Sequence, residues 1–194
     1  MVDLIEGDDG LSRCGWCGTD PEYQRYHDEE WGKPVRDDKL LFEKLCLEGF
    51  QAGLSWITIL RKRDRFREVF YNFNPSAVAE MEEADIDRLM SDPGIVRNRL
   101  KIEATISNAR AWLKIMEAGN NSFANFIWAT VDGKTKINRP LTRSDIPTKT
   151  AAAEFLSKRL KKAGFRFVGP TICYAFMQSM GLVDDHLKGC WKAS

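Results

Sequence analysis

The two histidines of this chain each lie near a cysteine, and the two pairs stand at opposite ends of 194 residues. Cys14 and His27 are near the N-terminus, whereas His186 and Cys190 are near the C-terminus. His186 and Cys190 are four positions apart, so on a helix both side chains would project from one face. Two thiolates and two imidazoles are a ligand set that structural Zn²⁺ prefers. The pattern therefore predicts one closed zinc site that joins the two ends of the chain.

Other interpretations of these residues stay open. The histidines could be surface or capping residues, and the cysteines could be free thiols. Cys14 and Cys17 also form a C-x-x-C pair, which could serve redox chemistry or could place Cys17 among the metal ligands instead of Cys14. The five cysteines are an odd number, which favours thiols or ligands over disulfides in a reducing compartment.

The chain shows no segment that would direct it to a membrane. No apolar run approaches the roughly 20 residues of a membrane span. The acidic start from Met1 to Gly10 lacks the basic and apolar regions of a signal peptide. We therefore expect a cytoplasmic protein with no membrane partner, and a monomer.

The net charge of +1 conceals an uneven distribution. Residues 1–50 contain 6 Lys and Arg against 13 Asp and Glu, whereas residues 51–194 contain 23 against 15. The basic residues gather in three segments, at 61–67, 97–101 and 158–166. Such clusters can bind a phosphate backbone, although a basic run is also typical of a solvated helix face. The charge pattern leaves both interpretations open.

Helical periodicity dominates, and we expect an all-α fold because no segment alternates apolar and polar residues convincingly. Capping residues and apolar spacing predict where the helices lie. One helix carries Leu40 to Leu47 after the capping candidates Asp37 and Asp38, one carries Ile57 to Phe70 after Ser55, a short one opens at Asn74-Pro75, and others fit Glu83 to Ser91, Ile102 to Met116, Ser122 to Val131, Thr150 to Lys162 and Thr171 to Met180.

We expect one compact unit over residues 12–194, made of two helical lobes. Residues 12–36 and 165–194 would form a terminal lobe held together by zinc, and the middle of the chain would form the second. Residues 1–11 are an acidic extension that we expect to be mobile. The polar segment 132–148, which contains glycine and two prolines, is predicted to be the most flexible loop.

Two features predict a binding pocket. Glu48 ends an apolar helix, before a turn with two glycines and the start of the next helix at Ser55. A carboxylate at such a junction can point into a pocket, or it can be a solvated helix-end residue. Aromatic faces stack bases and attract cations, although aromatic residues at helix spacing also form cores. The aromatic candidates are Trp16, Tyr23, Tyr26, Trp31 and Trp56.

A third feature is the segment from Gly164 to Ile172, in which glycines bracket an apolar tip before a helix that starts at Thr171. It is similar to the hairpin of a helix-hairpin-helix element, whose backbone N–H groups and adjacent helix N-terminus can bind a DNA phosphate. A glycine-rich junction that only turns the chain is the alternative.

These motifs together closely resemble the 3-methyladenine DNA glycosylase I family, within the helix-hairpin-helix glycosylase superfamily. The resemblance covers about residues 12–190. Its motifs are Arg13-Cys14-Gly15-Trp16, Asp20-Pro21 through Tyr23, Tyr26-His27-Asp28, Glu30-Trp31-Gly32, Leu47-Glu48-Gly49, Gln51 to Trp56, Phe167-Val168-Gly169 and His186 to Cys190.

The resemblance implies a function and a site. Cys14, His27, His186 and Cys190 would bind one structural zinc. Glu48 would receive a flipped base together with the aromatic residues Trp16, Tyr23, Tyr26 and Trp56, with Trp31 packed beside them. The partners would be double-stranded DNA containing alkylated bases, and free 3-methyladenine as the product. The DNA contacts would be Gln51, Gly53 and Leu54 in the gap left by the base, and Arg166, Val168, Gly169 and Thr171 in the hairpin.

The implied reaction needs little acid catalysis, because methylation at N3 makes adenine a positively charged leaving group. Bifunctional relatives use a lysine nucleophile that this sequence lacks at the expected position, so we expect base excision without strand cleavage. Asp184 departs from the family pattern, which has asparagine there. It could be a second catalytic residue beside Glu48, or it could cap a helix that carries the zinc ligands.

Two other classes of function remain. A zinc-stabilised DNA-binding module without catalysis would also account for the basic clusters. A redox protein would use Cys14 and Cys17, which ligation of Cys14 by zinc opposes.

Overall fold

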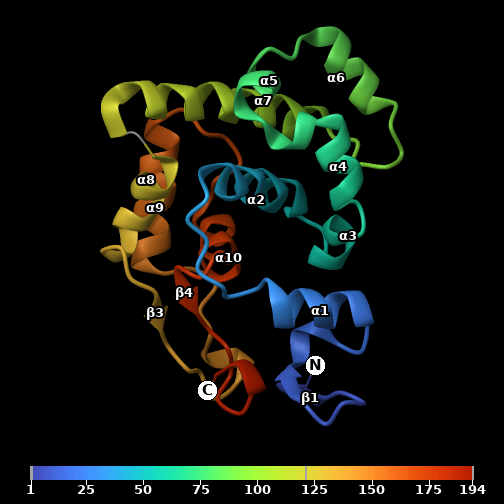
Figure 1. The fold of residues 1–194 in the computed structure, drawn as a ribbon, viewed down its shortest axis with the longest axis vertical. Coiled ribbons are helices and arrows are strands. Elements are labelled where there is room, and N and C mark those ends of the chain that lie inside the picture. Colours follow the sequence, from blue (N-terminus) through green and yellow to red (C-terminus); the bar gives the residue numbers. More distant parts are fainter. Residues whose placement is uncertain (1, 121, 194) are drawn as a thin grey trace.

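The computed structural model describes residues 2–120 and 122–193, which fold mostly into helices (Figure 1). The helices are α1 (Pro21–Glu29), α2 (Asp38–Gln51), α3 (Trp56–Leu60), α4 (Arg63–Val69), α5 (Pro75–Ala79), α6 (Glu83–Met90), α7 (Arg99–Ile115), α8 (Phe123–Trp128), α9 (Ala151–Lys162) and α10 (Pro170–Ser179). Two small strand pairs were not predicted: β1 (Leu4–Glu6) is antiparallel to β2 (Ser12–Cys14), and β3 (Lys136–Ile137) is parallel to β4 (Val183–Asp184). Among the described residues, no helix combines the length and apolar character needed to cross a membrane.

Side-chain caps explain where several helices begin. Asp37 accepts hydrogen bonds from the backbone N–H groups of Lys39 and Leu40 at 2.9 and 2.8 Å, so α2 starts as predicted. Asn74 caps α5 in the same way. Asp20 caps α1, and Pro21 is its first residue. Helix α1 was not predicted, although this Asp-Pro pair is a helix-start signal.

One predicted helix is broken in the structure. The helix expected from Ser55 to Phe70 divides at Arg61 and Lys62 into α3 and α4. The Ser55 hydroxyl bonds the hydroxyl of Thr58 instead of a backbone N–H group. The apolar spacing therefore identified the buried face correctly but could not show the break.

Helix α2 lies at the centre of the fold, between α7 and α10 (Figure 1). All ten residues from Leu41 to Phe50 are buried, including the charged residues Glu43, Lys44 and Glu48. A helix buried on all sides normally carries apolar residues, because a buried charge requires a partner. The charged residues of α2 therefore mark places where other elements supply partners.

Two buried polar residues of α7 fix two turns of the chain. The Lys101 ammonium donates to the backbone oxygens of Phe50 and Ala52 at 2.8 and 2.6 Å, at the end of α2. About two turns further along the same face of the helix, Asn108 donates to the Arg166 oxygen at 3.2 Å and accepts from the Arg166 N–H at 2.7 Å. Helix α7 thus holds both the turn after α2 and the turn between α9 and α10.

The two chain ends lie close together (Figure 1). Met1 lies outside the described residues, and the rest of the predicted extension, residues 2–11, supplies β1 of a hairpin with β2. The Asp3 carboxylate accepts from the Arg143 N–H at 2.7 Å, and Leu4 packs against a buried cluster of Cys14, Leu187 and Cys190. Pairing with β2 and these tertiary contacts give the acidic segment a defined structure, which composition does not reveal.

The segment after β4 corrects another expectation. His186 and Cys190 were expected on one face of a helix, but residues 185–190 form an irregular loop. The Cys190 N–H bonds the Leu187 oxygen at 2.8 Å in a tight turn. The turn, and not a helical repeat, brings these two residues back to the N-terminal segment.

Gly181, in the turn between α10 and β4, provides a test of this packing. Its φ is +70°, and a Cβ atom there would collide with the backbone of Lys33 and Pro34. Gly133 has a similar φ of +72° but open space around it. We expect Gly181→Ala to lower the free energy of unfolding by about 3 kcal/mol or more, and Gly133→Ala by only about 1–2 kcal/mol. Chemical denaturation measures both; equal losses would contradict the close packing of Gly181 against the backbone of Lys33 and Pro34.

Candidate functional site

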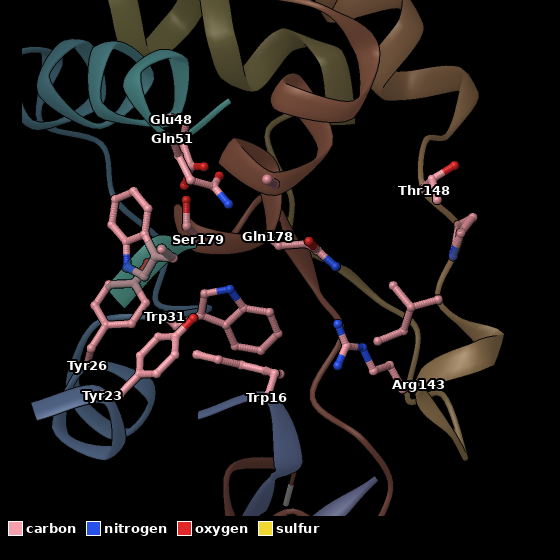
Figure 2. A pocket seen from close by; sticks show the side chains of 14 residues that line it. Trp16, Tyr23, Tyr26, Trp31, Glu48, Gln51, Arg143, Thr148, Gln178 and Ser179 are labelled. Carbon is pink, nitrogen blue, oxygen red and sulfur yellow. The ribbon is translucent and has the colours of Figure 1, made fainter. Parts of the chain in front are cut away.

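A cavity of about 390 Å³ opens between α1, α2, α10 and the loop at 143–148 (Figure 2). This size is in the range of cavities that hold small molecules. Every predicted pocket residue lines it, because the turns around α1 and α2 bring the aromatic side chains to the carboxylate. The lining consists of Trp16, Tyr23, Tyr26, Trp31, Glu48, Gln51, Trp56, Arg143, Ile146, Pro147, Thr148, Ala175, Gln178 and Ser179.

Aromatic rings form one wall of this cavity. The Trp16 ring lies 5.1 Å from the rings of both Tyr23 and Trp31, in edge-to-face geometry. Tyr26 continues the wall to Trp56, with ring centroids 5.5 Å apart. These contacts hold the rings at fixed angles, and Figure 2 shows them gathered on one side of the cavity. The aromatic residues are thus a pocket wall as well as part of the core.

Glu48 provides the pocket with a buried carboxylate. The side chain projects from α2 into the cavity, near Ser179 of α10 (Figure 2), and the residue is only 3% exposed. Burial raises the pKa of Glu48, and the Lys44 ammonium, 3.5 Å from one carboxylate oxygen, partly offsets this effect. The alternative of a solvated helix-end residue is therefore wrong. A carboxylate among aromatic faces fits a planar, electron-poor or cationic ligand.

The opposite wall was missed by the sequence analysis. Arg143, Ile146, Pro147 and Thr148 come from the loop that was predicted to be flexible. A capping box between Thr142 and the Asp145 carboxylate shapes this loop locally. The spacing of Thr142 and Asp145 in the sequence could have predicted a defined turn. Nothing in the sequence indicated that this turn packs near the aromatic residues.

A second site joins the chain ends. Ligand atoms of Cys14, His27 and Cys190 all lie within 4.8 Å of one another, and all three residues are buried. His27 Nε2 is 3.5 Å from the Cys190 sulfur. Cys17 does not join them, since its thiol donates to the Cys14 oxygen at 3.2 Å. Of the two cysteines in the C-x-x-C pair, Cys14 is the one that the fold places in the cluster.

His186 stands beside this cluster without belonging to the compact group of three. Its ring lies 5.3 Å from that of His27 and 4.6 Å from that of Trp31. Its Nε2 atom is buried and has no hydrogen-bond partner among the described residues. An orphaned buried nitrogen is unfavourable unless something binds it, which is what a metal ion would do. The residues present therefore fit a four-ligand metal site.

Both histidines are oriented by carboxylates. Asp28 contacts His27 Nδ1 at 2.7 Å, and Asp28 is in turn held by the Arg13 guanidinium at 2.7 Å. Asp184 contacts His186 Nδ1, also at 2.7 Å. A carboxylate on Nδ1 leaves Nε2 as the ligand atom, the usual arrangement around a bound metal.

Asp184 is not part of the pocket lining. Its carboxylate also accepts from the His186 N–H at 3.1 Å and pairs with Arg139 at 2.7 Å. Burial works in the opposite direction, but the hydrogen bonds from His186 and Arg139 hold the pKa of Asp184 well below its usual range. Asp184 orients a histidine, and among the described residues no helix begins directly after it.

Acidic residues pair with most of the first two basic clusters. Asp20, Glu30 and Glu43, from the acidic first fifty residues, pair with the cluster at 61–67, and Glu83 and Asp87 pair with Arg99. Lys101 is buried, as described above. The uneven charge distribution therefore stabilises contacts between segments. Of the three clusters, 158–166 retains the most exposed basic side chains that form no ion pair among the described residues: Lys158, Lys161 and Lys162.

The predicted DNA contacts lie on two turns. Gln51 lines the pocket, Gly53 has a φ of +83°, and Leu54 is 43% exposed. In the turn between α9 and α10, Arg166 and Thr171 are exposed, whereas the Val168 side chain is buried and its oxygen accepts from Ser157. Only backbone atoms of Val168 remain for a ligand. Gly169 is the N-cap residue of α10, which has no side-chain cap.

Fold and pocket together define a helical protein with an aromatic-lined cavity beside a buried carboxylate. The chain belongs to the methyladenine glycosylase family, whose model matches residues 16–193. The hairpin of β1 and β2 precedes the matched range.

The chain is similar to characterised members of this family. It is 54% identical over 180 residues to DNA-3-methyladenine glycosylase 1 of Escherichia coli strain K12, covering 93% of this chain and 96% of that protein. It is 52% identical over 179 residues to DNA-3-methyladenine glycosylase of Haemophilus influenzae, covering 92% and 96%.

Solved structures agree with this assignment. A crystal structure of a 3-methyladenine DNA glycosylase I has a TM-score of 0.91 at 54% identity, covering 92% of this chain and 98% of that one. The Staphylococcus aureus 3-methyladenine DNA glycosylase I, studied for its recognition of 3-methyladenine, has a TM-score of 0.89 at 46% identity, covering 93% and 97%.

Proposed function

We propose that this chain is a monofunctional DNA repair glycosylase, which excises 3-methyladenine from alkylated DNA by hydrolysis and leaves an abasic site. The observation that carries the proposal is the burial of Glu48 among the aromatic rings of Trp16, Tyr23, Tyr26 and Trp56. Membership of the methyladenine glycosylase family supports the same activity. The product, free 3-methyladenine, is the ligand that this pocket would retain.

The pocket suits the charge of the substrate. Methylation at N3 gives the adenine of the nucleotide a positive charge, which the π faces and the Glu48 carboxylate can bind. Each cation–π contact contributes about 0.5–2 kcal/mol, the larger value where water is excluded. Flipping the base out of the duplex costs a few kcal/mol, less for a damaged base. Discrimination would therefore come from electrostatics, since an uncharged adenine gains little from either group.

Hydrolysis then needs only a good leaving group and a water molecule. Cleavage of the N-glycosidic bond neutralises the base, and water attacks the sugar carbon. Among the described residues, no lysine lines the pocket, so no amine is available there to form a covalent intermediate with the sugar. This composition supports base excision without strand cleavage.

We assign a structural zinc ion to Cys14, His27, His186 and Cys190. Zn–S and Zn–N bonds of about 2.3 and 2.0 Å at a tetrahedral angle set sulfur and nitrogen about 3.5 Å apart, close to the 3.5 Å between Cys190 Sγ and His27 Nε2. The hydrogen bond with Cys14 and the neighbouring His27 lower the pKa of Cys190, whereas the same contact with Cys190 raises the pKa of Cys14, so without a metal the pair favours one thiolate and one thiol. When bound, the ion would supply cross-linking and no catalytic step, because four protein ligands leave no open position.

The zinc would act on the pocket through its position. His27 follows Tyr26 on α1, and the His186 ring packs against Trp31. Joining segments 12–36 and 165–194 in a terminal lobe would hold the aromatic wall opposite Glu48. We therefore propose that this terminal lobe and the helical middle of the chain form two lobes of one compact unit.

The DNA interface would combine the two turns that α7 holds. Gln51, Gly53 and Leu54 would enter the gap left by the flipped base. The turn between α9 and α10 would act as a helix-hairpin-helix element, with Arg166, Gly169 and Thr171 and the backbone of Val168 at a phosphate. An uncapped helix N-terminus offers N–H groups and a favourable dipole to such an anion.

Glu48→Gln tests the proposed function. The substitution keeps the shape of the side chain but removes its charge, so single-turnover excision of 3-methyladenine should fall by about 100-fold or more. Affinity for the duplex should change little, because phosphate contacts lie elsewhere. Glu43→Gln, on the same helix but outside the pocket, is the matched control. Excision that survives Glu48→Gln would contradict the role of the carboxylate, and a wild-type protein that binds DNA without releasing base would favour the non-catalytic module.

Asp184→Asn tests whether Asp184 orients the proposed zinc ligand His186 or takes part in catalysis. Loss of the charged partner of His186 should weaken Zn²⁺ binding by about 10–100-fold, measured by competition with a chelator. With zinc saturating, single-turnover excision should equal that of the wild type. Asp132→Asn, at an exposed position, is the control. Reduced excision by the zinc-loaded Asp184→Asn protein would instead assign Asp184 a catalytic role.

Arg166→Ala tests the DNA interface. Loss of one phosphate contact should weaken binding to all duplexes similarly, and should reduce the slope of log affinity against log salt by about 1. Arg88, which pairs with Asp85 within α6, provides the control substitution to Ala. An unchanged slope for Arg166→Ala would place the phosphate contact elsewhere.

A further inference from the structure

A second cavity, of about 220 Å³, lies behind the wall of the base pocket. Trp56 lines both cavities, whereas Lys44 lines only the second. Lys44 is 6% exposed, so its ammonium group is enclosed by protein. A base bound in the first cavity would therefore not displace Lys44. The lysine could keep its contacts with the pocket residues while a base is bound.

The Lys44 ammonium contacts three residues of the base pocket from behind. It donates a hydrogen bond of 2.5 Å to the Tyr26 hydroxyl and lies 3.5 Å from a carboxylate oxygen of Glu48. It also lies 3.3 Å from the centroid of the Trp56 ring. One buried amine thus reaches the anion, a hydroxyl and an aromatic face of the proposed site.

A buried carboxylate with no cationic partner takes up a proton. A protonated Glu48 would lose its attraction for a cationic base. Lys44 stands one helical turn before Glu48 on α2, where an ammonium and a carboxylate can face each other. Lys44 therefore lies where its ammonium group can supply the positive charge that an ionised Glu48 requires.

We propose that Lys44 is a positioning residue, which keeps Glu48 ionised and orients the Tyr26 hydroxyl, and so sets the lower pH limit of base excision. The proposal rests on the proposed function, because it assigns Lys44 a role at the same pocket. Lys44 touches no substrate atom and acts through its contacts with Glu48 and Tyr26.

Other groups around Glu48 do not supply this charge. Burial raises the pKa of both Tyr23 and Tyr26, on α1, so both are neutral. Arg63, on α4, donates to both carboxylate oxygens of Glu30. From α10, Ser179 offers only a hydroxyl. Lys44 is the one cation that forms an ion pair with Glu48 in the described part of the chain.

Lys44 remains mostly protonated at neutral pH. Burial lowers its pKa to about 8, while the charges of Glu48 and Glu30 work in the opposite direction. Since Lys44 donates to the Tyr26 oxygen, the hydroxyl hydrogen of Tyr26 is left for a different acceptor. A ring nitrogen of a bound purine is one such acceptor.

The test is the pH profile of single-turnover excision on a duplex containing 3-methyladenine, corrected for spontaneous base loss. We expect Lys44→Met to move the acidic limb upward by at least about one pH unit, because a Glu48 without its cation ionises only at higher pH. At pH 6, excision by Lys44→Met should be about tenfold slower than that of the wild type. At pH 9, the two rates should be similar. Lys44→Arg should keep the limb near its wild-type position. Lys39→Met removes an exposed lysine from the same helix and is the matched control.

Further variants keep the outcome decisive. Lys44→Gln, which retains a hydrogen-bond donor for Tyr26, should move the limb as Lys44→Met does, and it replaces Lys44→Met if that protein fails to fold. The double variant Lys44→Met/Glu48→Gln should lose no more activity than Glu48→Gln alone. Acidic limbs that coincide for wild type, Lys44→Met and Lys44→Gln, or additive losses in the double variant, would overturn the inference.

Glu48→Gln separates this inference from the proposed function. If Glu48→Gln remains active, the proposed role of the carboxylate fails whatever Lys44 does. If Glu48→Gln is inactive and the Lys44 variants keep the wild-type pH profile, only the role of Lys44 fails.

Discussion

The burial of the Glu48 carboxylate on α2 is the constraint around which the rest of this structure is arranged. Helix α2 has no solvent face over residues 41–50, so an anion there must find partners within the protein. Lys44 lies one turn away and Ser179 faces it from α10. A cavity remains on the side of the aromatic wall, and the carboxylate projects into it. A buried charge costs stability unless it is paired, and the contact with Lys44 supplies the pairing.

The buried cluster of Cys14, His27 and Cys190 lies where the N-terminal segment, which carries aromatic rings of the pocket, meets the C-terminal loop. Trp16, Tyr26 and Trp31 come from short elements that bury little surface of their own. The cluster joins their segment to the loop after β4, and the carboxylates of Asp28 and Asp184 orient its histidines. The hairpin of β1 and β2 extends this joint to the loop at 143–148 through Asp3. Both walls of the pocket therefore depend on contacts at the chain ends.

Charge serves two purposes in different parts of the molecule. The acidic N-terminal segment pairs with the basic residues at 61–67, so much of the charge difference between the two parts of the sequence is used within the fold. Helix α7 uses the buried side chains of Lys101 and Asn108 to hold two turns. These turns carry the residues proposed to meet DNA, so their geometry is set before any nucleic acid binds. Preformed turns lower the entropic cost of binding a phosphate backbone.

The sequence by itself determined the helical class, most helix positions, the metal-ligand candidates and the aromatic and acidic residues of the pocket, because caps, apolar spacing and ligand chemistry act over a few residues. It did not determine the break between α3 and α4, the hairpin at the N-terminus or the loop that carries His186 and Cys190. It also gave no sign that Lys44 stands behind the pocket or that Arg143 and Thr148 form its second wall. Those features depend on which distant segments meet, and only tertiary packing decides that. For the same reason, the sequence could not show whether Glu48 is solvated or buried, because the burial of a side chain depends on the elements that cover it.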